Sequence, residues 1–188
     1  MNQPAYRFAV YEDLFDLPDH VIGEILHGQL ITQPRPAPKH ARSASIIGGE
    51  VMGPFDQGKG GPGGWWILDE PELHLGSHIL VPDLAGWRKE RMPRFPNEAY
   101  FSLAPDWVCE VISPGTARTD RVVKMPIYAA ESVQWLWLVD PDLRILEVYR
   151  LLDGHWLLER TWQNDDIVNA PPFDAISMNL GDFWLPQD

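Results

Sequence analysis

The sequence predicts an α/β fold in which a mixed β-sheet forms the core and helices flank it. Segment 106–113 is a nearly continuous apolar run, which is typical of a strand buried on both faces. Segment 39–55 has the apolar spacing of a helix, and segment 133–162 alternates between strands and turns. Together these segments indicate one α/β domain that spans residues 1–188.

The N-terminal part of the chain predicts a short helix followed by a hairpin. Segment 9–17 has the pattern of a short amphipathic helix. Segment 20–33 contains two apolar-rich runs on either side of His27-Gly28, and glycine supplies the positive φ that a tight turn needs. Strand alternation places Glu24 among apolar side chains. A carboxylate there is costly unless it is paired, protonated or bound to a metal ion.

The middle of the chain is expected to form one helix, a loop and several strands. Segment 39–55 is the expected helix. Segment 53–64 is rich in glycine and is expected to be a loop, and segment 88–105 is polar and contains proline. Between these two loops three strands are expected, over 65–68, 73–75 and 79–87.

The buried strand at 106–113 is followed by a helix and then by a C-terminal β-meander. The helix is expected within 119–131, where Pro126 either marks its start or kinks it. Lys124 lies at or just before that point. The meander has turns at 140–142 and 153–154, segment 168–172 is expected to be a loop, and the strands are expected over 133–140, 143–152 and 156–162.

Composition limits the function classes that fit the chain. There are 188 residues, of which 45% are hydrophobic, and no apolar run reaches the ~18 residues of a membrane helix. The N-terminus does not have the pattern of a signal peptide. Cys109 is the sole cysteine, so an internal disulfide is excluded and a reducing, cytoplasmic setting is favoured. The net charge of −12 counts against simple electrostatic binding of nucleic acid, although metal held on carboxylates makes a site locally positive.

Three polar residues in apolar surroundings carry the strongest chemical signal. Asp83 lies in the apolar segment ILVPDLAGW, and Glu110 lies in the middle of WVCEVI. Two carboxylates on adjacent strands are a usual cradle for Mg²⁺, and a nearby lysine such as Lys124 can orient water or stabilise charge on a phosphate. The alternative is structural: Glu110 and Lys124 form a buried ion pair, and Asp83 satisfies a loop.

The chain resembles the Uma-type restriction endonucleases of the PD-(D/E)xK nuclease superfamily. The matching stretches are GEILHGQLI, VPDLAGW and PDWVCEVISPGTARTDRVVKMPIYAAESVQWLWLVDP, and the resemblance runs from about Tyr11 to Leu180. It implies a restriction-endonuclease-like fold. The sequence departs from the superfamily pattern at Ile112, which stands where the motif has its lysine. In this family the lysine has moved to the following helix, and Lys124 is the matching position.

The resemblance also implies an activity, with Asp83, Glu110, Lys124 and Glu24 as the catalytic set. The chain would be a Mg²⁺-dependent endonuclease acting on DNA, with Mn²⁺ as a possible substitute. Asp83 and Glu110 would hold the metal together with the Val111 carbonyl. Glu24 would tune the site or bind a second ion. A homodimer is expected, because cutting both strands of a duplex needs two sites. The alternative is a non-catalytic interaction protein that keeps the nuclease fold.

Several weaker signals leave alternatives open. Asp106 follows a second proline, but it lies ~13 Å from Glu110 along an extended strand, too far to share an ion. Cys109 faces the other side of that strand and is interpreted as a core residue. His40 either touches a phosphate or has a capping or surface role. Trp65, Trp66 and Trp87 either stack on bases or serve packing or a subunit interface.

Overall fold

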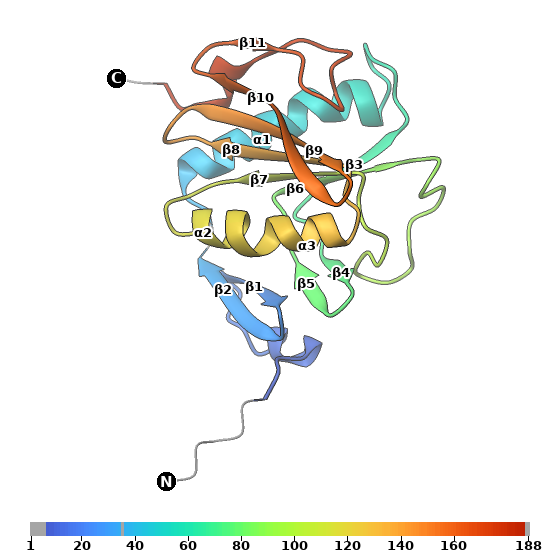
Figure 1. Ribbon diagram of the computed structural model, residues 1–188, viewed down its shortest axis with the longest axis vertical. Coiled ribbons are helices and arrows are strands. Elements are labelled where there is room, and N and C mark those ends of the chain that lie inside the picture. Colours follow the sequence, from blue (N-terminus) through green and yellow to red (C-terminus); the bar gives the residue numbers. More distant parts are fainter. Residues whose placement is uncertain (1–6, 35, 187–188) are drawn as a thin grey trace.

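The centre of the fold is a six-stranded mixed sheet. The computed structural model describes residues 7–34 and 36–186. The strand order is β10-β9-β8-β7-β6-β3, and within it β7 and β8 run parallel while the other neighbours are antiparallel (Figure 1). The predicted mixed sheet and C-terminal meander are thereby confirmed. The strands are β3 (Trp65–Asp69), β6 (Leu84–Arg88), β7 (Trp107–Val111), β8 (Trp135–Asp140), β9 (Ile145–Leu152) and β10 (His155–Gln163).

A second sheet, built on the predicted hairpin, lies beneath the first in Figure 1. Its strand order is β2-β1-β5-β4. The turn between β1 and β2 has positive φ at both central residues, 51° at His27 and 72° at Gly28, a conformation that matches the twist of paired strands. The strands are β1 (Val21–Leu26), β2 (Gln29–Pro34), β4 (Leu73–Leu75) and β5 (His78–Leu80).

Helical segments cover opposite faces of the central sheet (Figure 1). On one face lies α1 (Pro38–Val51), which continues into a π-helical turn at Met52–Asp56. On the other face lie α2 (Ala117–Thr119), a π-helical turn at Asp120–Lys124, and α3 (Met125–Ala130). No helix among residues 7–34 and 36–186 has the length and apolar character needed to cross a membrane.

Alternation along β7 divides the core into two parts. Trp107, Cys109 and Val111 belong to the cluster that includes Ile47 and Val51 of α1. Val108 and Ile112 belong instead to the cluster that includes Ile127 and Tyr128 of α3. These four residues of β7 and Ile112, which follows the strand, are at least 95% buried, as expected for a strand covered on both faces. Glu110 therefore lies on the α3 side of the sheet.

The helix that carries Lys124 is continuous through Pro126 but is distorted just before it. The N–H of Met125 donates to the carbonyl of Asp120, five residues earlier, instead of four. A proline has no N–H and disturbs the preceding turn, and a wider turn is one way in which a helix accommodates this. Of the two expected alternatives, α3 begins next to Pro126, at Met125, and the π-helical turn at Asp120–Lys124 leads into it.

Three sequence predictions need correction. Segment 79–87 is not one strand, because β5 ends at Leu80 and β6 begins at Leu84. Asp83 thus lies in a connector and not within a strand, in keeping with Pro82, which cannot donate to a strand ladder. The glycine-rich loop begins only after the helical turn at Met52–Asp56.

Two short elements also differ from their predictions. The expected helix at 9–17 is reduced to a single 3₁₀ turn, Tyr11–Leu14, since a segment this short gains too few hydrogen bonds to offset nucleation. A loop is expected over 168–172, but its first residue belongs to a strand. That strand, β11 (Ile167–Val168), pairs with β12 (Met178–Asn179) in a two-stranded sheet. A final 3₁₀ turn spans Leu180–Phe183.

Candidate active site

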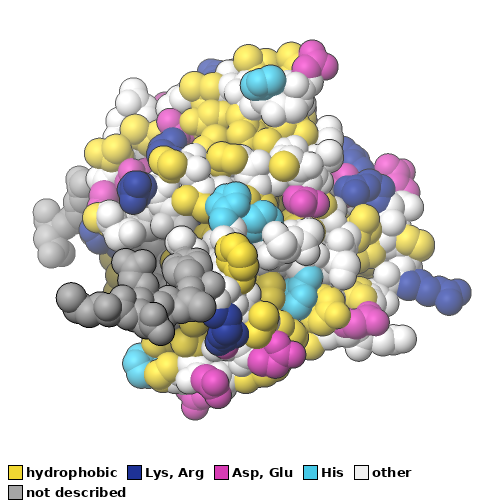
Figure 2. Space-filling model, turned by 60° about the horizontal axis from the view of Figure 1, so that its bottom comes forward, with side chains coloured by type: hydrophobic (Ala, Val, Ile, Leu, Met, Phe, Trp, Pro, Cys, Tyr) yellow, Lys and Arg dark blue, Asp and Glu magenta, His cyan; other side chains and the backbone are white. Residues whose placement is uncertain are grey.

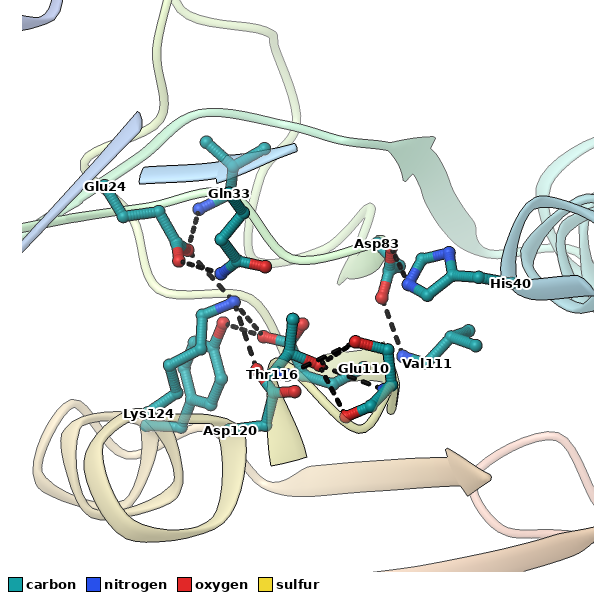
Figure 3. A network of polar contacts seen from close by, with 12 residues as sticks. Glu24, Gln33, His40, Asp83, Glu110, Val111, Thr116, Asp120 and Lys124 are labelled. Atoms are coloured by element: carbon teal, nitrogen blue, oxygen red, sulfur yellow. Dashed lines mark hydrogen bonds and ion pairs between the residues drawn. The ribbon is translucent and has the colours of Figure 1, made fainter. Parts of the chain in front are cut away.

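Four segments that are distant in the sequence bring the predicted residues to one cavity of about 280 Å³. Glu24 comes from β1, Asp83 from the connector before β6, Glu110 from β7, and Lys124 from the π-helical turn (Figure 3). Glu24, Glu110 and Lys124 are 0%, 3% and 2% exposed, so their charges lie out of contact with bulk water. The structural alternative requires only that Glu110 and Lys124 pair, whereas the catalytic interpretation requires all of these side chains to line one cavity.

Lys124 occupies the centre of a buried ion-pair network. Its Nζ lies 2.9 Å from Oε1 of Glu110 and 3.0 Å from Oε1 of Glu24. Oδ1 of Asp120, on the same helix, is 3.7 Å away, which is too long for a hydrogen bond. Burial lowers the pKa of Lys124, but the surrounding carboxylates outweigh this effect and hold the pKa well above its usual value. The side chain is therefore an ammonium ion at neutral pH, and it keeps one donor for a further partner.

Glu110 is held at one of its two carboxylate oxygens. The hydroxyl of Tyr128 donates a 2.6 Å hydrogen bond to Oε1, the same oxygen that Lys124 contacts. Within the described part of the chain, this hydrogen bond reaches Oε1 and leaves Oε2 without a donor. Burial raises the pKa of Glu110 well above its usual value, Lys124 opposes this rise, and the neighbouring acids add to it.

The carboxylate of Asp83 contacts one residue of β7 and one residue of α1. Its Oδ2 accepts a 2.6 Å hydrogen bond from the N–H of Val111, and its Oδ1 lies 3.2 Å from Nε2 of His40 in α1. Val111 therefore contributes its N–H to Asp83. His40 does not cap α1, whose N-cap is Ala37, but lines the cavity. Burial lowers the pKa of His40, whereas the hydrogen bond and charge of Asp83 raise it, and the net shift is upward.

Both oxygens of Glu24 already have partners. Oε1 accepts a 2.8 Å hydrogen bond from the N–H of Val81 in addition to the contact with Lys124. Oε2 accepts a 3.1 Å hydrogen bond from Nε2 of Gln33 in β2. Of the three ways to bury this carboxylate, the structure therefore shows pairing.

Negative charge exceeds positive charge around the cavity. Five acidic side chains line it, namely Glu24, Glu70, Asp83, Glu110 and Asp120, against the single ammonium of Lys124. Carboxylates buried without compensation are costly, so this arrangement favours either a bound proton or a bound cation. Oxygen donors are the ligands that Mg²⁺ prefers, and Mg²⁺ completes its shell with water. Among residues 7–34 and 36–186, no three His, Cys, Asp or Glu side chains are already grouped as a metal cage.

Sequence analysis missed two residues of this network, Asp120 and Tyr128. Burial raises the pKa of Asp120, and Lys124 opposes that rise. Tyr128 has no exposed surface. A signal was present in the chain, because Asp120, Lys124 and Tyr128 follow one another at intervals of four, the spacing of one helix face.

Other candidates identified in the sequence lie outside the cavity lining. Asp106 accepts a hydrogen bond from the N–H of Arg88 at 2.8 Å and pairs with Arg91 at 2.8 Å, which confirms that it is not part of the acid pair at the cavity. Cys109 has no exposed surface, as expected for a core residue. Trp65 and Trp87 are 3% and 0% exposed, so both side chains pack in the core.

The surface does not present one basic patch on the face shown in Figure 2. Lys and Arg side chains are dispersed there among acidic and apolar ones (Figure 2). The Nζ of Lys89 lies 4.1 Å from the centre of the Trp66 ring, so one side of that indole is already covered. This distribution agrees with the net charge of −12.

Comparison with known proteins identifies the family. The family model Uma2, described as putative restriction endonuclease, matches residues 11–181. This chain belongs to the Uma2 family. A crystal structure of a putative nuclease of DUF820 from Anabaena variabilis is similar to this Uma2 chain, with 25% sequence identity and a TM-score of 0.71. The match covers 92% of this chain and 95% of that one, and it confirms the predicted fold class. No curated protein matches the chain.

Proposed function

We propose that this Uma2 chain is a Mg²⁺-dependent endonuclease that hydrolyses DNA phosphodiester bonds, with Mn²⁺ able to replace Mg²⁺. Family membership and the nuclease neighbour support nuclease function in general. The observation that carries the proposal is the convergence of Asp83, Glu110, Lys124 and Glu24 on one acidic cavity, from four separate segments.

Asp83 and Glu110 are the proposed metal ligands. The Val111 N–H and His40 hold the two oxygens of Asp83, and the Tyr128 hydroxyl holds Oε1 of Glu110, which restricts each carboxylate to a defined orientation. Each also keeps lone pairs for a cation, because a carboxylate offers about four acceptor positions. The metal supplies polarisation of a phosphoryl oxygen and a lower pKa for a bound water.

Lys124 is proposed to orient the attacking water or to stabilise charge on the phosphate. Two of its three N–H donors are directed at Glu24 and Glu110, and the third has only the distant Asp120. As an ammonium ion it donates hydrogen bonds and does not accept a proton. Glu24 is proposed to tune the site by holding Lys124 in place, because both of its oxygens are occupied.

The proposal is tested by cleavage of supercoiled plasmid in Mg²⁺ or Mn²⁺. The native chain is compared with Glu110→Gln and Lys124→Met, and with Lys39→Met as a control that removes an exposed lysine paired with Asp142. We expect the native chain and the control to nick DNA and the two site variants to be inactive although folded by circular dichroism. Equal activity in all four proteins would disprove the assigned roles.

A second candidate is a non-catalytic interaction protein that keeps the nuclease fold. The net charge of −12 favours it, as does the ammonium of Lys124, which already neutralises part of the acidic cavity. Inactivity on all DNA substrates, together with no Glu110-dependent metal binding in calorimetry, would favour this candidate. A homodimer in a cytoplasmic setting remains part of the nuclease proposal, and light scattering of the purified chain tests the dimer.

A further inference from the structure

Tyr128 is a buried polar residue for which the proposed metal and lysine roles do not account. It lies in α3 and has no exposed surface, and its ring packs in the core cluster on the α3 side of the central sheet. Packing alone would be served equally well by phenylalanine. The hydroxyl is directed at the cavity and donates to Oε1 of Glu110 at 2.6 Å, a short distance for an O–H donor.

The contacts of Glu110 give this hydroxyl a specific role. Oε1 receives both Tyr128 at 2.6 Å and Lys124 at 2.9 Å. Two donors from α3 and the π-helical turn therefore hold one oxygen, and Oε2 remains without a hydrogen bond from the described residues. A carboxylate held at one oxygen loses less rotational freedom when the other oxygen binds a cation.

We infer that Tyr128 is a positioning residue that fixes Oε1 of Glu110 and so leaves Oε2 as the oxygen that takes the metal ion. Lys124 alone does not fix this orientation, because its ammonium is shared with Glu24 at nearly the same distance. The tyrosine hydroxyl has no second described acceptor and acts on Glu110 alone.

Because this role rests on the proposed function, the test measures metal binding as well as cleavage. Tyr128→Phe removes the hydroxyl and keeps the buried ring. The matched control is Tyr149→Phe, which removes a half-buried hydroxyl from β9 whose neighbours are Arg121 and Glu147. Calorimetric titration with Mn²⁺ gives the dissociation constant, and plasmid cleavage over a range of Mn²⁺ concentrations gives the activation constant.

We expect Tyr128→Phe to raise both constants by roughly 10-fold or more, the size found when a group that orients a ligand is removed. Tyr149→Phe is expected to leave both constants unchanged. Circular dichroism of metal-free Tyr128→Phe shows whether the fold is retained, so that a change in the two constants is assigned to the lost contact with Glu110 and not to a general loosening of the core.

The outcomes distinguish failure of the inference from failure of the proposed function. If native protein binds Mn²⁺ and Tyr128→Phe binds it equally well, the positioning role is wrong and the nuclease proposal stands. If native protein binds Mn²⁺ but cuts no DNA, the nuclease proposal fails, and the calorimetry still decides on Tyr128. If native protein binds no Mn²⁺, the positioning role is overturned together with the metal site.

Discussion

Replacement of Lys124 by methionine tests the electrostatic account of the site most directly. The change keeps an unbranched side chain of similar length and removes the ammonium that contacts Glu110 at 2.9 Å and Glu24 at 3.0 Å. Breaking a buried pair by removing one partner costs about 3–5 kcal/mol, because the other charge stays buried without compensation. At about 2–4 °C per kcal/mol for a domain of this size, the melting temperature should fall by roughly 6–20 °C.

The matched control is Lys39→Met. Lys39 pairs with Asp142, and their side chains are 52% and 38% exposed. Exposed pairs contribute about 0–1 kcal/mol, so this variant should melt within a few degrees of the native protein. Thermal unfolding followed by circular dichroism at a single protein concentration gives the comparison.

The dependence of this effect on pH provides a second check. Burial raises the pKa of Glu110 and of Asp120 in the folded protein, and Lys124 opposes both shifts. Without Lys124 these acids take up protons on folding more readily. A carboxyl group whose folded pKa is raised favours the folded state at low pH, and this contribution is lost as pH rises. The deficit of Lys124→Met should therefore be smaller near pH 5 than near pH 8, within the range where both proteins fold.

Two results would refute this reasoning. The first is a Lys124→Met variant that is as stable as Lys39→Met, since the ammonium would then contribute no more than an exposed lysine. The second is a deficit that grows as the pH falls, since the carboxyl groups would then not be the source of the cost.

Three further predictions concern Asp106, Cys109 and the proposed metal ion. Asp106→Ala removes the acceptor for Arg88 N–H and Arg91, so urea unfolding should show a loss of about 1–3 kcal/mol while cleavage by the folded protein is retained. The Cys109 thiol is fully buried and burial raises its pKa well above the usual value, so a disulfide reagent should react with it only after denaturant is added. Removal of divalent metal with EDTA should abolish cleavage, and Mn²⁺ should raise the melting temperature of the native chain but not of Glu110→Gln.

Much of the architecture could be predicted because its signals are local. The His27-Gly28 turn fixes the hairpin, and the apolar run around Glu110 marks a strand that is buried on both faces. The connector at Asp83 resembles a strand in sequence because its flanking residues are apolar, whereas Pro82, which cannot donate to a strand ladder, is the local signal against a strand.

The candidate site was predicted only in part, because its remaining members depend on how the helix is distorted. Lys124 is a candidate from its sequence context and from the family resemblance, but spacing alone does not distinguish a catalytic lysine from a structural one. Asp120 and Tyr128 follow the four-residue spacing of a helix face, but the turn between Asp120 and Lys124 is π-helical. Sequence periodicity assumes about 3.6 residues per turn, so it does not show where a wider turn places its side chains.

The π-helical turn at Asp120–Lys124 makes the length of this segment matter as much as its composition. One residue corresponds to about 100° of rotation in an α-helix. Deleting one residue from this turn would restore a regular helix and would rotate everything before it relative to α3, separating Asp120 from Lys124 or Lys124 from Glu110. Related chains should therefore tolerate exchange of exposed residues such as Val122 far better than a change in the number of residues between Glu110 and Tyr128.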